Sequence, residues 1–208
     1  MEINLFFSLA ILVISIVVHE VSHGYAAYFL GDPTAKYAGR LTLNPFPHVD
    51  LLGSIIVPVI LALLPGSIIF GWAKPVPVNT YNLRHGKWGE AIVAVAGPIS
   101  NLVIAAVSAL FIRLSVAGTL PLAEASVSLL AGIALVNIVL AVFNLMPIPP
   151  LDGSKILYAL LPARFSGVRN VLERHGFLFV ILFIFIIWSP IAEIVIPWLY
   201  NMLTGLAF

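Results

Sequence analysis

Cysteine is absent from the 208 residues, and Asp, Glu, Lys and Arg together make up only 9% of them. The absence of cysteine excludes disulfides and thiolate ligands, so a metal site here must use histidine and carboxylate side chains. The scarcity of charge, beside 61% hydrophobic residues and a mean hydropathy of +1.10, excludes a water-soluble globular domain. The net charge is only +1 and the basic residues are scattered in short loops, so the charge gives no indication of nucleic-acid binding and no nucleic-acid partner is expected. The composition predicts a multi-pass protein of the lipid bilayer.

Long polar segments are also lacking, so residues 1–208 are expected to form a single membrane domain. Residues 1–4 carry no Lys or Arg, and no small-residue cleavage site follows, so the first apolar run is expected to be a retained helix. Further apolar runs predict spans over 90–114 and 125–145. Two prolines divide the last run, 177–208, which predicts a kinked span followed by a helix at the membrane interface.

Three ionisable side chains interrupt the first apolar run, at His19, Glu20 and His23. Such groups are costly in hydrocarbon and usually functional there. One helical turn separates the two histidines, so both imidazoles can bind one zinc ion, with Glu20 beside it. In this H-E-x-x-H spacing the carboxylate accepts a proton from a zinc-bound water. The competing interpretation is that the histidines only form hydrogen bonds to neighbouring helices.

A second polar motif, N-L-M-P-I-P-P-L-D-G, occupies residues 144–153. Its three prolines cannot continue a helix, and extended backbone at membrane depth is tolerated only inside protein or against a cavity. Asp152 directly precedes an apolar helix expected over 153–161, where it would act as an N-cap. Beside an H-E-x-x-H motif that lacks a third ligand, Asp152 instead completes a His, His, Asp and water site, as catalytic zinc requires.

The residues between the first two full spans are expected to surround this site. Ala38–Leu43 has the composition of a short strand that could pair with an unwound substrate, although a plain loop fits equally well. For His48 and Asp50, a surface histidine and a helix cap are preferred over metal contacts. Residues 72–79, W-A-K-P-V-P-V-N, predict a rigid extended segment that serves as a groove wall or a connector. Asn101, at membrane depth, requires a hydrogen-bond partner and is expected to help shape the site.

The segment 51–70 is about long enough to span, but Pro58 and the Pro65-Gly66 pair interrupt it. If it enters and returns, nine of the ten Lys and Arg residues lie on one side of the membrane and only Arg113 lies on the other. If it crosses, two of those nine move to the Arg113 side. Because Lys and Arg favour cytoplasmic loops, re-entrance is the preferred topology.

Three motifs resemble those of the site-2 protease family of intramembrane zinc metalloproteases: H-E-V-S-H at 19–23, A-G-P-I-S-N at 96–101 and the proline-rich motif at 144–153. Their order is similar to that of the family's three-helix catalytic core, here about residues 1–162, which leaves about 163–208 as accessory helices. The G-R-L-T-L-N-P and G-W-A-K-P-V-P-V-N stretches are similar to those of small prokaryotic members, and no PDZ or CBS insertion interrupts the chain.

The resemblance implies an all-α polytopic fold with a short β or extended re-entrant element after the first helix, and one Zn²⁺ per chain. His19, His23 and Asp152 correspond to the zinc ligands, and Glu20 corresponds to the catalytic acid/base. Asn144 corresponds to a residue that holds the substrate or the developing oxyanion.

The implied function is hydrolysis of peptide bonds in or near transmembrane segments of membrane-protein substrates, in a prokaryotic cell membrane, with the site toward the cytoplasm. The expected partners are the lipid bilayer and a transmembrane protein or peptide; no oligomeric state follows from the sequence. Two other classes compete. A metal-ion or proton transporter would place ionisable residues along a path and often has inverted repeats, whereas this chain converges its buried charges on one locus and has no visible repeat. A catalytically silent relative would have lost a ligand or Glu20.

Overall fold

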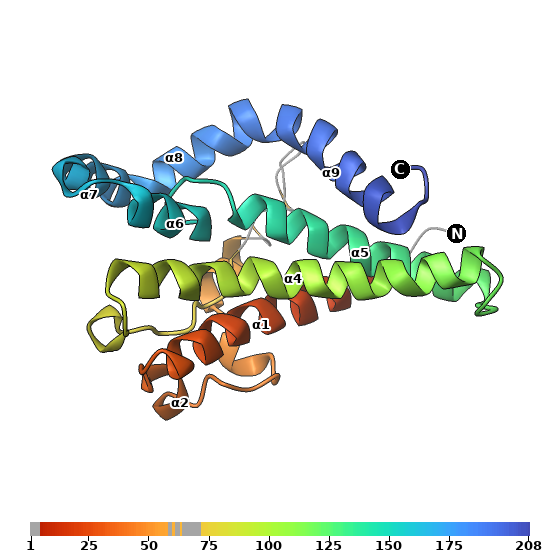
Figure 1. The fold of residues 1–208 in the computed structure, drawn as a ribbon, viewed down its shortest axis with the longest axis horizontal. Helices are drawn as coiled ribbons and strands as arrows, with labels where there is room; N and C mark the ends of the chain where they lie inside the picture. Colours follow the sequence, from red (N-terminus) through yellow and green to blue (C-terminus); the bar gives the residue numbers. More distant parts are fainter. Residues whose placement is uncertain (1–4, 58–59, 61–62, 64–71) are drawn as a thin grey trace.

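The computed structural model describes residues 5–57, 60, 63 and 72–208, and within these ranges it is helical and contains no strand (Figure 1). The longer elements are α1 (Leu5–Phe29), α4 (Lys87–Val116), α5 (Glu124–Asn144) and the consecutive α8 (Gly176–Phe183), η5 (Ile184–Trp188) and α9 (Ser189–Thr204). The shorter ones are α2 (Thr34–Tyr37), η1 (Phe46–His48), η2 (Leu51–Ile56), η3 (Thr80–Asn82), α6 (Asp152–Leu160), η4 (Ala163–Phe165) and α7 (Ser166–Arg174). The predicted all-α class is confirmed.

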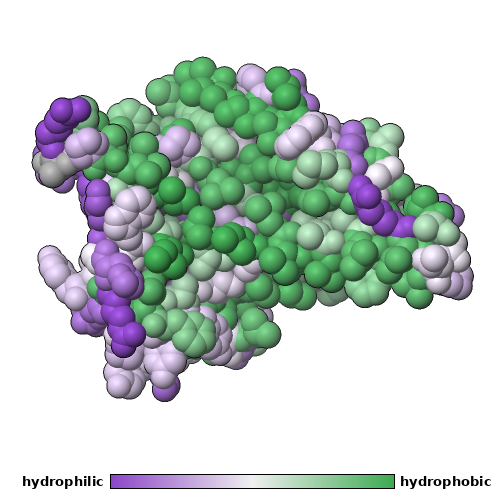
Figure 2. All heavy atoms as spheres, in the orientation of Figure 1, coloured by the Kyte–Doolittle hydropathy of each residue, from purple (hydrophilic) through white to green (hydrophobic). Residues whose placement is uncertain are grey.

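Four helical stretches of the described residues are long and apolar enough to cross a bilayer: 6–29, 87–116, 124–144 and 176–204. Their outward surfaces are apolar, and Figure 2 shows hydrophobic residues covering the middle of the molecule, with hydrophilic residues gathered mainly at its ends. Such a surface is favourable only in contact with lipid. The chain is therefore an integral membrane protein that crosses the bilayer several times.

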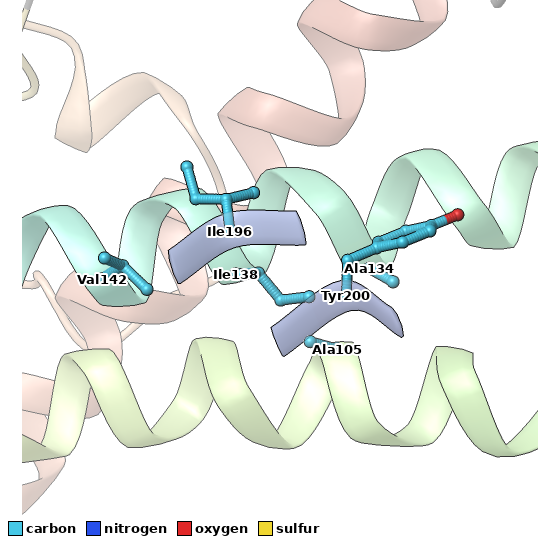
Figure 3. Close-up of a cluster of buried hydrophobic side chains, with 6 residues drawn as sticks. All are labelled: Ala105, Ala134, Ile138, Val142, Ile196 and Tyr200. Atoms are coloured by element: carbon cyan, nitrogen blue, oxygen red, sulfur yellow. The ribbon is translucent and has the colours of Figure 1, made fainter. Parts of the chain in front are cut away.

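Helix α4 lies at the centre of the fold and contacts α1, α5, α6 and α9. Its buried face is rich in glycine and alanine, which lets neighbouring helix backbones approach closely in a bilayer. Between α4, α5 and α9 lies an apolar cluster formed by Ala105, Ala134, Ile138, Val142, Ile196 and Tyr200 (Figure 3). This packing holds α4 in place, and α4 in turn contacts the side chains of the candidate site.

The predicted interfacial helix at the end of the chain is wrong. Pro190 falls in the first turn of α9, where a proline needs no intrahelical partner, so the last span continues through the π-helical turn η5 into α9. α9 then packs against α4 and α5 with Tyr200 buried. At its far end, Arg113 of α4 donates to the carbonyl oxygens of Met202 and Leu203, both at 2.6 Å. The helix end is thus capped from within the fold.

The predicted strand over Ala38–Leu43 is also wrong, because these residues form turns and bends after α2. The backbone N–H of Arg40 donates to Ala35 O at 2.9 Å, and Gly39 has a left-handed φ of +66°, so the local backbone serves to end α2. The guanidinium of Arg40 turns inward and donates to Lys74 O at 2.7 Å. With these bonds the segment closes a helix and anchors a loop, and it joins no ladder.

The question of whether segment 51–70 crosses or re-enters falls largely outside the residues that the structure describes. On either side of it the described chain comes together: Trp72 N donates to Gly53 O at 3.1 Å, and Lys74 N donates to His48 O at 2.9 Å. The described residues on the two sides of the segment therefore lie next to each other. The loop 72–86 and the region around α6 and α7 lie at the left of Figure 1, where α4 begins, and the loop 31–50 lies below α1 in the left half of the picture.

Candidate active site

The three side chains predicted as metal ligands lie together, although 133 residues separate His19 from Asp152. His19 and His23 project from α1, one turn apart, toward the first residue of α6. The two Nε2 atoms are 3.0 Å apart, and each is 3.1 Å from Asp152 Oδ2. All three residues are buried, with at most 8% of their surface exposed. The structure thus brings together the two distant motifs at one point.

The outer ring nitrogens of both histidines are held by oxygen atoms of α4. His19 Nδ1 is 2.6 Å from Asn101 Oδ1, and His23 Nδ1 is 2.7 Å from the backbone oxygen of Val93. Amide and carbonyl oxygens only accept hydrogen bonds, so both Nδ1 atoms carry a proton, and each ring in its neutral form presents a lone pair at Nε2. With both rings neutral, three acceptor atoms face one another, and this arrangement suits a cation.

The donor set also fits zinc in kind and spacing. Zinc binds imidazole nitrogen and carboxylate oxygen at about 2.0–2.1 Å, so two ligands of a tetrahedral site lie about 3.3 Å apart. The three atoms here are separated by 3.0–3.1 Å. They also line a cavity of about 340 Å³, with space for water and for a substrate carbonyl. Such a site keeps the open position that distinguishes catalytic from structural zinc.

Asp152 does not cap α6, so the competing N-cap interpretation of this residue is wrong. The N-cap position is Leu151, and no side chain caps the helix. Of the two carboxylate oxygens, Oδ2 faces the histidines and Oδ1 lies 3.6 Å from Lys155 Nζ. Gly153 allows this placement, since a Cβ there would lie 2.1 Å from the backbone oxygen of Leu145. The D-G pair therefore packs α6 directly against the end of α5.

Glu20 lines the same cavity, and the backbone orients its carboxylate. Its Oε2 accepts a hydrogen bond from Val76 N at 2.8 Å. Val76 lies between Pro75 and Pro77 in the non-helical segment 74–79, here called the strap. Prolines restrict the backbone on both sides, so the direction of this N–H is narrowly set.

Both ends of the strap are anchored. At Lys74 the anchors are the bonds to Arg40 and to the backbone of His48 described above. At Asn79 the backbone N–H donates to Asp32 Oδ2 at 2.6 Å, while Thr34 and Asn82 donate to Oδ1. Burial by itself would raise the pKa of Asp32, but the bonds from Thr34, Asn82 and Asn79 outweigh it and hold this pKa below its usual value. An ionised Asp32 therefore fixes the strap.

The remaining candidate residues of this region have different roles in the structure. Asp50 caps η2 by accepting a hydrogen bond from Gly53 N at 2.7 Å, so its interpretation as a helix cap is confirmed. His48 is not at the surface: only 2% of it is exposed, and its Nε2 donates to Thr42 O at 3.0 Å, away from the cavity. Asn144 does line the cavity, where its Nδ2 donates to Leu140 O at 2.9 Å.

Two features of the site are not predicted from the sequence. Gly97 lies against the histidine rings: a Cβ there would be 2.5 Å from His23 Nε2 and 2.6 Å from two ring atoms of His19. Its position, four residues from both Val93 and Asn101, places all three on one face of α4. The second feature is Asn137 on α5, fully buried and hydrogen-bonded to Asn101. A Gly-Pro pair and a single asparagine in an apolar run are the only sequence signals for them.

Comparison with known proteins identifies the family of this chain. Residues 114–187 match the model of Peptidase family M50. The putative zinc metalloprotease YwhC of Bacillus subtilis (strain 168) is 39% identical over 178 residues, which are 83% of this chain and 78% of YwhC. The putative zinc metalloprotease Rip2 of Mycolicibacterium smegmatis is 30% identical over 167 residues, 80% of this chain and 62% of Rip2. No solved structure matches. The chain therefore belongs to peptidase family M50, the site-2 protease family, and is a membrane zinc metalloprotease with Zn²⁺ as its cofactor.

Proposed function

We propose that this protease cleaves peptide bonds in or near transmembrane segments of membrane-protein substrates, with zinc held by His19, His23 and Asp152. The observation that carries the proposal is the set of three buried acceptor atoms, 3.0–3.1 Å apart, in a cavity that Glu20 also lines. The two histidines belong to a membrane-spanning helix, so the reaction takes place at membrane depth. When bound, zinc supplies a Lewis acid that acidifies water and polarises a carbonyl.

Glu20 is the general base of this proposal. Its carboxylate takes a proton from the attacking water and later gives that proton to the departing amine nitrogen. Val76 N–H keeps Oε2 directed, which leaves Oε1 for the transfer. Asn144 is the candidate for binding the substrate oxygen: one of its two amide hydrogens is used by Leu140 O, and the other is available to a carbonyl that acquires negative charge.

The substrate must lose its helical structure before cleavage, because a helical peptide bond is shielded and its carbonyl is already bonded. Water must also enter the cavity. Thr80, Glu90 and Lys155 line it in addition to the ligands and supply polar groups for that water. The loops beside it carry most of the basic residues, which supports a cytoplasmic orientation of the site.

We further propose that residues 1–208 form one membrane domain, with a catalytic core over about 1–162. The last helix supports this division, since α9 packs on the outside of α4 and α5 and contributes no residue to the cavity lining.

Replacing Asp152 with alanine tests the ligand set without knowledge of the substrate. Purified wild-type protein is expected to contain about one zinc per chain, whereas Asp152→Ala should bind zinc at least about tenfold more weakly, because one of three protein ligands is lost. Metal analysis after dialysis measures both. Glu193→Gln, at an exposed carboxylate on α9, is the matched control and should keep its zinc. Wild-type protein that stays metal-free when zinc is supplied would rule out the proposed site.

The depth of cleavage needs a separate experiment. A single-span model peptide is reconstituted with the enzyme in liposomes, and the product termini are identified by mass spectrometry. The proposal expects chelator-sensitive cuts inside or next to the apolar segment. Cuts confined to water-exposed tails would leave a metalloprotease that does not act within the membrane.

The hydrogen bond from the strap to Glu20 can be tested by substitution. Val76→Pro removes the N–H that directs Glu20 and places a third proline in a segment that is already proline-rich. A hydrogen bond to a charged group contributes about 1.5–3 kcal/mol, so the turnover number should fall roughly ten- to a hundredfold while the zinc content stays unchanged. Val76→Ala keeps the N–H and should retain nearly full turnover. Equal activity of the two variants would show that the strap does not orient the base.

A further inference from the structure

We propose that Asn137 is a positioning residue of the zinc site, which acts through Asn101 to fix the ring orientation and the tautomer of His19. The inference rests on the proposed function, since it requires His19 to be a zinc ligand. Asn137 touches neither the cavity nor a ligand, and it lies on α5, a helix that contributes no residue to the ligand set.

A buried polar network joins α1, α4 and α5. Asn101 and Asn137 are both fully buried, and Ser15 is 3% exposed. Asn101 Nδ2 donates to Asn137 Oδ1 at 2.8 Å and to the backbone oxygen of Ser15 at 3.3 Å. Asn137 Nδ2 donates to Ser15 Oγ at 2.9 Å and to Ile133 O at 2.9 Å. Each amide nitrogen thus uses both of its hydrogens.

The directions of these bonds follow from two backbone oxygens that can only accept: Ile133 O, which is 2.9 Å from Asn137 Nδ2, and Ser15 O, which is 3.3 Å from Asn101 Nδ2. Ile133 O is a backbone carbonyl, so the side chain that meets it must donate, and Asn137 therefore presents its nitrogen to Ile133 and its oxygen to Asn101. Asn101 must then present its nitrogen to Asn137, which leaves its oxygen for His19. If either amide were rotated by half a turn, two like groups would face each other.

This chain of hydrogen bonds ends at His19 and determines its tautomer. Facing Asn101 Oδ1 at 2.6 Å, His19 Nδ1 has to carry the hydrogen, and Nε2 keeps its lone pair toward His23 and Asp152. With Asn101 rotated, Nδ1 would accept and Nε2 would carry a hydrogen that points into the ligand cluster. That tautomer cannot bind a metal through Nε2.

His23 needs no such arrangement, because its Nδ1 is bound by the backbone oxygen of Val93. The two ligands therefore differ: a backbone carbonyl supports one, and a relay of side chains supports the other. At this depth water is scarce, so a lost side-chain bond is not readily replaced by solvent. The relay should then be the more sensitive of the two supports to substitution.

The experiment measures zinc affinity by chelator competition in Asn137→Ala, Asn101→Ala and the double variant. Loss of an outer support typically weakens metal binding 10–100-fold. Asn137→Ala is expected to weaken binding about tenfold, and Asn101→Ala at least as much. The double variant should match Asn101→Ala alone, because Asn137 has nothing left to orient. Effects that multiply would overturn the relay.

Ile138→Ala is the matched control. Ile138 is the neighbour of Asn137 on α5, is fully buried and lies in the apolar cluster of Figure 3. Its truncation should lower the melting temperature and leave the zinc affinity unchanged. If Asn137→Ala only lowers the melting temperature, as this control does, Asn137 is a packing residue and the proposal fails while the zinc site stands. If wild-type protein binds no zinc, the proposed function and this inference fall together.

Discussion

Glu20→Gln is expected to reduce peptide cleavage by roughly a hundred- to ten-thousandfold, which is the range that general acid–base catalysis contributes. Glutamine keeps the shape of the side chain and can still accept the Val76 N–H, but its amide cannot take a proton from water. The variant should keep about one zinc per chain, because Glu20 is not among the proposed ligands. Single-turnover cleavage of a reconstituted transmembrane peptide, together with metal analysis, measures both quantities.

Glu90→Gln is the control for this prediction, since Glu90 is another carboxylate that lines the cavity. Glu90 lies 3.4 Å from Arg169 and far in sequence from the H-E-x-x-H motif. Its neutralisation should change cleavage by less than about tenfold, the size of a part-exposed ion pair. Wild-type cleavage by Glu20→Gln would remove this residue from the mechanism, whatever the zinc content.

Gly97→Ala should abolish zinc binding and activity together. The added methyl group would lie 2.5–2.6 Å from the imidazoles of His19 and His23, inside van der Waals contact. The rings cannot retreat, because their outer nitrogens are bound to the same helix α4. Either α1 and α4 separate or the two Nε2 atoms leave their common focus. We expect at least a hundredfold loss of zinc affinity, as misplacement of both ligands implies, measured by chelator competition.

A second tight glycine on the same helix separates this local effect from general damage. A Cβ on Gly89 would lie 2.4 Å from Arg84 O, in the loop before α4. Gly89→Ala should therefore introduce a comparable steric strain and lower the melting temperature. The variant should still bind zinc. If both alanine variants bind zinc normally, Gly97 has no special relation to the metal.

The sequence predicts those parts of the structure that depend on local patterns. The four spans follow from apolar runs whose lengths match a bilayer, and His19 and His23 share a face because one helical turn separates them. Asp152 follows from chemical reasoning, since a metal site without cysteine needs a carboxylate and the proline-rich motif supplies one at membrane depth. Its position against both imidazoles is what the structure adds.

The errors and omissions concern contacts between segments that are distant in the chain. Ala38–Leu43 has a strand-like composition, but the inward turn of Arg40 toward Lys74 decides its conformation. The final helix is held inside the fold by Arg113, a partner about 90 residues away. Asn137 belongs to no recognisable sequence motif, because its role depends on a hydrogen bond to Asn101, which lies on another helix. Contacts of this kind cannot be predicted from a short stretch of the sequence.

The distance along the chain between the proposed ligands has a consequence for biosynthesis. When α1 has entered the membrane, two of the three ligands are in place, but Asp152 follows only after α4 and α5 have been made and inserted. A nascent chain therefore inserts its first three spans before the proposed ligand set is complete, and only the last span follows Asp152. With that ligand set, a chain at this stage should not yet cleave other membrane segments. On the proposed ligand set, the entry of α6 therefore sets the earliest stage of biosynthesis at which the site can hold zinc.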